Sequence, residues 1–108
     1  MDLVEARLAC VTQFMLERRL TEVSKRLARA REELAVVDEQ ARALADAADD
    51  ARVRALVSET PLAARESQEA SRHAEAMAGA RDQLAGQVHR LEAELNELLD
   101  KLVTGAGG

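Results

Sequence analysis

The chain has 108 residues, a formal net charge of −5, one Phe, one Pro and no Trp or Tyr. This scarcity of aromatic residues excludes an aromatic-centred globular core, and the absence of Ile leaves little material for a β-sheet. Ala, Glu, Lys, Leu and Arg supply 65 residues. That share exceeds the roughly 50% that is typical of coiled coils when apolar residues recur regularly. The composition therefore predicts an all-α protein.

Charge and hydropathy narrow the partners and the compartment. An acidic balance disfavours nucleic acid as the main partner, because phosphate binding depends on a positive surface. No apolar run approaches the ~20 residues that span a bilayer, and the first residues do not resemble a secretory signal. We expect a cytoplasmic protein without a membrane span. Arg outnumbers Lys 13 to 2 and Ala is abundant, which indicates a bacterial source with a GC-rich genome.

The first predicted helix covers residues 2–46. Apolar residues recur there at alternating steps of four and three, which is the heptad pattern of a coiled-coil seam. The seam residues are Leu16, Leu20, Val23, Leu27, Ala30, Leu34, Val37, Ala41, Leu44 and Ala48. Upstream, Val4, Leu8, Val11 and Met15 keep the same rhythm in another frame, so the apolar stripe changes face near Phe14.

The chain is predicted to turn over residues 47–60, with a short helix inside the turn. Asp46, Asp49 and Asp50 are poor helix-interior residues and good caps, while Val53 and its apolar neighbours fall outside the phase of the first seam. Thr60 is a favoured N-cap residue and Pro61 is favoured at the first helical position. The next helix is therefore expected to begin at residue 61.

The second predicted helix covers residues 61–103. Its seam comprises Ala63, Ser67, Ala70, Ala74, Met77, Arg81, Leu84, Val88, Leu91, Leu95, Leu98 and Leu102. Arg81 is its single charged member, and we expect Glu22 to be its acidic partner. Two helices of similar length around a short turn predict one antiparallel coiled-coil hairpin over residues 1–103. Val4 would then lie near Leu102, and Leu44 near Leu62 or Ala63. The glycine-rich residues 104–108 are expected to form a flexible tail.

No pattern of catalytic or metal-binding residues is present. His73 and His89 have no second ligand at a recognised metal spacing. Cys10 has no nearby histidine to activate it, and a lone cysteine cannot form an intrachain disulfide. We therefore expect neither an enzyme nor a cofactor.

Two charged clusters are candidate docking sites for a protein partner. Residues 18–31 form a basic stretch whose residues include Arg18, Arg19, Lys25, Arg26 and Arg29. It is either a solvated face paired with returning-helix acids such as Glu75 and Asp82, or a patch for an acidic partner. The acidic cluster of Asp46, Asp49 and Asp50 is either a set of helix caps or an acidic tip. With an acidic tip the chain resembles, in architecture alone, the hairpin of Gre-type transcript-cleavage factors. This leaves a small transcription-associated or nucleic-acid-contacting regulator as the alternative function.

The main functional expectation is a non-catalytic adaptor, scaffold or oligomerisation module. A single two-helix seam cannot cover all the apolar residues at the open end of the hairpin. The excess residues are Leu3, Cys10, Phe14, Leu99 and Val103. They predict self-association of two hairpins, probably as a homodimeric four-helix bundle.

Overall fold

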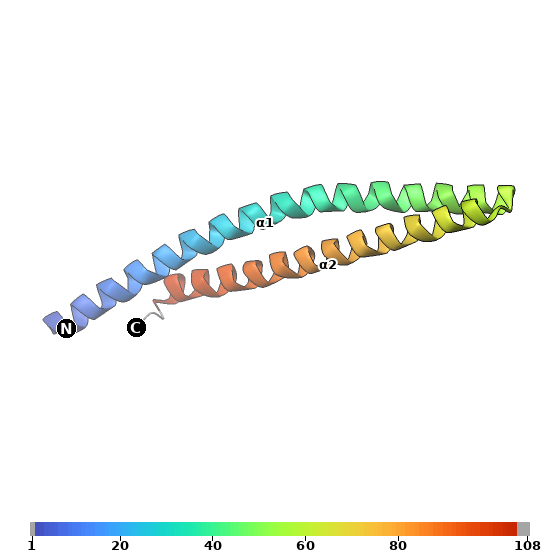
Figure 1. Ribbon diagram of the computed structural model, residues 1–108. Coiled ribbons are helices and arrows are strands. Elements are labelled where there is room, and N and C mark those ends of the chain that lie inside the picture. Colours follow the sequence, from blue (N-terminus) through green and yellow to red (C-terminus); the bar gives the residue numbers. More distant parts are fainter. Residues whose placement is uncertain (1, 106–108) are drawn as a thin grey trace. The chain divides into compact units, whose positions relative to one another are not determined.

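The computed structural model describes residues 2–105, and these form two helices without a strand. Helix α1 runs from Leu3 to Ser58 and α2 from Pro61 to Thr104. Figure 1 shows them joined by a single tight turn. The predicted all-α antiparallel hairpin is confirmed. Residues 106–108 of the predicted tail lie outside the described residues, whereas Thr104 still belongs to α2.

The turn consists of Glu59 and Thr60. Glu59 has a φ of 51°, in the left-handed region, and its N–H donates to the carbonyl oxygen of Ala55. Thr60 then caps α2, because the Ala63 N–H donates to the Thr60 hydroxyl oxygen at 3.1 Å. Pro61 occupies the first helical position. The sequence prediction for the start of the second helix is confirmed.

The predicted short helix at the turn is wrong, because α1 continues without a break to Ser58. Ala51 is buried and Ala55 is half-buried, so these two alanines extend the seam in phase beyond Ala48. Val53, Leu56 and Val57, which suggested a break, are exposed on other faces of the same helix. The first helix is therefore 12 residues longer than the predicted 2–46.

The hairpin divides into two compact units that each contain parts of both helices. The open-end unit comprises the described residues of 1–31 and 87–108, and the turn unit comprises residues 32–86. All predicted seam residues are buried or half-buried within their units. The buried side chains of the open-end unit are Val23, Leu27, Ala30, Val88, Leu91 and Leu98. Those of the turn unit are three alanines, Ala41, Ala48 and Ala51.

In the open-end unit, two ion pairs fix how α1 and α2 align. Arg19 pairs with Glu94, and Arg31 lies 3.5 Å from Glu92. The alignment that fits both pairs sets Leu20 level with Leu98, Leu27 level with Leu91, and Leu16 level with Leu102. The predicted proximity of Val4 to Leu102 is therefore wrong, as is the matching position of Leu44 beside Leu62. Both errors follow from placing the turn too early in the chain.

The start of α1 extends past the end of α2 in the open-end unit (Figure 1). Helix α1 has 56 residues and α2 has 44, so α1 is 12 residues longer. This difference corresponds to about 18 Å of helix at 1.5 Å per residue. From Leu3 to Met15, Ala6 and Thr12 are the two residues that are half-buried, and the rest are exposed. The first three turns of α1 therefore have no covering helix within the described chain.

Candidate protein-interaction surface

The five residues predicted for self-association lie on one side of the open-end unit. Arg31 and Glu92 pair across that side of the two helices. Steps of seven residues keep the same face of a coiled-coil helix, and a residue four positions on lies beside that face. Such steps lead from Arg31 back to Cys10 and Leu3, with Phe14 beside them, and from Glu92 to Leu99, with Val103 beside it. All five side chains are exposed, with Phe14 at 62% and Val103 at 85%.

A second apolar stripe follows the outer side of α1, away from α2. Val4, Leu8, Val11 and Met15 are 55–63% exposed and follow alternating steps of four and three. Small or polar residues, Ala6, Ala9 and Gln13, hold the heptad positions that would face α2. A longer α2 would therefore not cover this stripe. Phe14 borders the stripe and is itself exposed, so it does not fill a gap in the seam.

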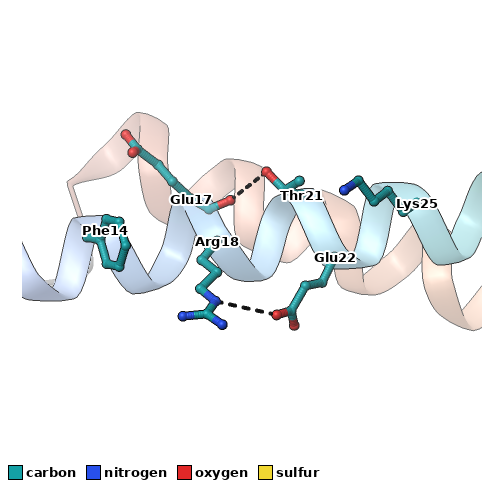
Figure 2. A pocket seen from close by; sticks show the side chains of 6 residues that line it. All are labelled: Phe14, Glu17, Arg18, Thr21, Glu22 and Lys25. Carbon is teal, nitrogen blue, oxygen red and sulfur yellow. Dashed lines mark hydrogen bonds and ion pairs between the residues drawn. The ribbon is translucent and has the colours of Figure 1, made fainter.

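The outer side of α1 changes from apolar to charged after Met15. Phe14, Glu17, Arg18, Thr21, Glu22 and Lys25 line an open hollow of about 450 Å³. All six come from α1, so the hollow is a space between side chains along one helix. Figure 2 shows Arg18 turned toward Glu22 and Lys25 extending away from that pair. A ligand here would meet an aromatic ring at one end and a cationic group at the other.

The basic stretch is only partly neutralised by the returning helix. Arg19 pairs with Glu94 and Arg31 with Glu92, whereas Glu75 and Asp82, the predicted partners, make no contact with it. Arg18 pairs with Glu22 at 3.7 Å. Within residues 2–105, Lys25, Arg26 and Arg29 form no ion pair. These three cations are the part of the stretch that remains available to a partner.

The acidic cluster is on the side of α1 and not at the tip of the hairpin. Because α1 runs to Ser58, Asp50 is eight residues from the end of the helix. Asp49 pairs with Arg52 at 2.7 Å, while Asp46 and Asp50 are exposed and unpaired in the described chain. The predicted acidic tip is therefore wrong, and neither capping nor a tip explains these side chains.

Arg81, the charged member of the second seam, is half-buried in the turn unit and reaches an acid on the other helix. Its guanidinium lies 4.0 Å from Asp38 and donates to Asp82 at 3.3 Å. The expected partner, Glu22, pairs with Arg18 and Arg19 instead. An acidic neighbour was predicted correctly, but its identity was wrong because the helices align differently.

The described residues contain no site of the kind that catalysis or metal binding uses. No three His, Cys, Asp or Glu side chains among residues 2–105 come together as a metal-binding group. His73 lies by Glu69 and Arg72 on an exposed face of α2, and His89 lies 4.0 Å from Glu92. Neither α1 nor α2 includes a segment with the length and apolar character needed to cross a membrane.

Comparison with known proteins adds no relative from which a function could be transferred. No protein-family model, curated protein or solved structure matches this chain significantly. The class of protein is therefore defined by its fold and surface alone: an antiparallel helical hairpin with an uncovered apolar segment at the start of α1.

Proposed function

We propose that the protein is a non-catalytic oligomerisation or adaptor module that binds through the open-end unit. The observation that carries the proposal is the group of five exposed side chains on one side of that unit: Leu3, Cys10, Phe14, Leu99 and Val103. Exposed apolar patches of this kind mark interaction surfaces in soluble proteins. We place the protein in the bacterial cytoplasm on the basis of its composition.

The preferred partner is a second copy of the chain. Fully burying one large apolar side chain stabilises a complex by about 1.5–3 kcal/mol, and these side chains are already partly covered. One copy of the surface would therefore supply only several kcal/mol, compared with an association cost of about 4–15 kcal/mol. A homodimer contributes the surface twice, and the favourable contribution then becomes comparable with the cost.

Sedimentation equilibrium of a double variant tests this proposal. Phe14→Glu with Leu99→Glu places two charges on the surface, and we expect a dimer to become a monomer with unchanged helical circular dichroism. Ala76→Glu with Ala93→Glu is the matched control, because both alanines are exposed on α2 away from this surface. We expect this control to remain dimeric. A monomeric wild type at tens of micromolar would overturn self-association.

The alternative of a nucleic-acid-contacting regulator is supported by one observation, the unpaired cations Lys25, Arg26 and Arg29. Its test is fluorescence anisotropy with a labelled DNA duplex at low salt. If the alternative is right, replacing the three cations by alanine weakens binding and reduces its salt dependence. No binding by the wild type would exclude duplex DNA as the partner. The net charge of −5 makes this the weaker candidate.

A further inference from the structure

The outer side of α1 carries a different sequence of side chains in each unit. In the open-end unit, the apolar stripe of Val4, Leu8, Val11 and Met15 is followed on the same face by Arg18, Glu22, Lys25 and Arg29. Steps of seven connect them, as in Val4, Val11, Arg18 and Lys25. We call these eight residues the apolar–basic face. All eight are exposed.

In the turn unit, the outer side of α1 has the complementary character. Steps of seven give Glu32, Glu39, Asp46 and Val53 along one line, and Val36, Ala43, Asp50 and Val57 along the next. All eight residues are exposed, including Val53 at 57%. We call them the acidic–apolar face. Its order is the reverse of the first, because here the carboxylates come before the apolar residues.

We infer that the apolar–basic face of one copy packs antiparallel against the acidic–apolar face of a second copy. This inference rests on the proposed function, in which the open-end unit binds another copy, and it names the surface that this unit meets. One alignment of the two faces brings Val11 level with Val57, and Met15 level with Val53. The same alignment brings Arg18 level with Asp50 and Arg29 level with Glu39.

Charge complementarity between the two segments supports this pairing. Residues 18–31 contain six basic side chains and one acidic, whereas residues 32–50 contain seven acidic and one basic. In the described chain, Lys25, Arg29, Glu39, Asp46 and Asp50 form no ion pair. The antiparallel alignment places these unpaired cations beside these unpaired carboxylates. Glu22 opposite Asp46 is the one unfavourable pair, and Arg18 and Arg19 already neutralise Glu22.

The inference also accounts for exposed apolar residues that the open-end surface does not include. Val53 and Val57 are exposed beside a row of carboxylates, where a solvated helix face would carry polar residues. The outer seam on both segments keeps the alternating steps of four and three that two helices need to interlock. When both copies use both faces, a two-fold dimer results; a single contact per pair would give larger assemblies.

Single cysteines test the alignment directly in the full chain. In a Cys10→Ser background, one population carries Met15→Cys and a second carries Val53→Cys. We expect rapid oxidation of the mixture to a mixed disulfide dimer, with little cross-linking in either population alone. Dominant cross-links between two Met15→Cys chains would show that the open ends meet each other. That result would overturn this inference while leaving the proposed self-association intact.

Charge reversal supplies an independent test. Variant A carries Arg18→Glu, Lys25→Glu and Arg29→Glu, and variant B carries Glu39→Lys, Asp46→Lys and Asp50→Lys. Each alone should weaken self-association by about 10-fold or more, because charges of like sign then oppose each other. An equimolar mixture should recover to within about threefold of wild type, since A and B are complementary in both contacts.

The outcomes separate the two proposals. Unchanged dimers of A and B alone would overturn this inference and not the proposed function. Weakening in both variants without recovery in the mixture would also overturn the inference, because the faces would not be each other's partners. A monomeric wild type would overturn both, and this is measured first.

Discussion

Replacing Leu27 with alanine should lower the free energy of unfolding by about 2–3 kcal/mol. Leu27 is 2% exposed in the seam of the open-end unit, level with the buried Leu91. Buried Leu→Ala substitutions cost about 2–5 kcal/mol. The lower part of this range applies because one neighbouring helix, and not a surrounding core, contacts the side chain. For a chain of this length, about 4 °C in Tm accompanies each kcal/mol, so Tm should fall by about 10 °C.

Leu56→Ala is the matched control, because it makes the same chemical change in the same helix. Leu56 is 72% exposed, so its substitution should change stability by less than about 0.5 kcal/mol. Helix propensity affects both variants equally. Urea and thermal unfolding followed by circular dichroism would measure the two differences. Equal losses in the two variants would refute the assignment of the seam as the source of stability.

Three further substitutions test the turn and the seam by the same unfolding measurements. Glu59→Gly should raise stability by up to about 1 kcal/mol, because Glu59 has a φ of 51° that glycine adopts without strain; a loss would show that the Glu59 side chain has a separate role. Thr60→Ala should lower it by about 1 kcal/mol by removing the cap on Ala63, and no change would mean that the cap is dispensable. Arg81→Leu should be neutral or stabilising, since Asp38 is 4.0 Å away and the site is half-buried in the seam; a large loss would refute that account.

The two seams could be predicted from the sequence because heptad spacing reports directly which residues face another helix. Each predicted seam residue from Leu16 to Ala48 and from Ala63 to Leu102 is buried or half-buried. The cap at Thr60 was also predictable, since its chemistry is local. These features depend on neighbours within one or two helical turns, which the sequence specifies.

The end of α1 could not be predicted from its large apolar residues. Val53, Leu56 and Val57 suggested a change of face, whereas the smaller Ala51 and Ala55 continue the seam. Asp46, Asp49 and Asp50 disfavour a helix interior only weakly when they are exposed on its outer side, and seam packing overrides that preference. The misplaced turn then shifted the alignment of the helices and hid the uncovered segment from Leu3 to Met15.

The alanine seam of the turn unit has a consequence for how this part of the molecule opens. An alanine side chain removes much less apolar area from water than a leucine, so each layer of this seam adds less free energy than a leucine layer. Local opening reactions follow such differences, and amide hydrogens in weakly packed regions exchange with solvent without global unfolding. Backbone amides around Ala48 and Ala70 should therefore exchange faster than those around Leu27 and Leu91. The half of the hairpin nearest the turn would act as a separate, less stable cooperative unit that transiently separates its strands of helix while the leucine-lined half stays folded.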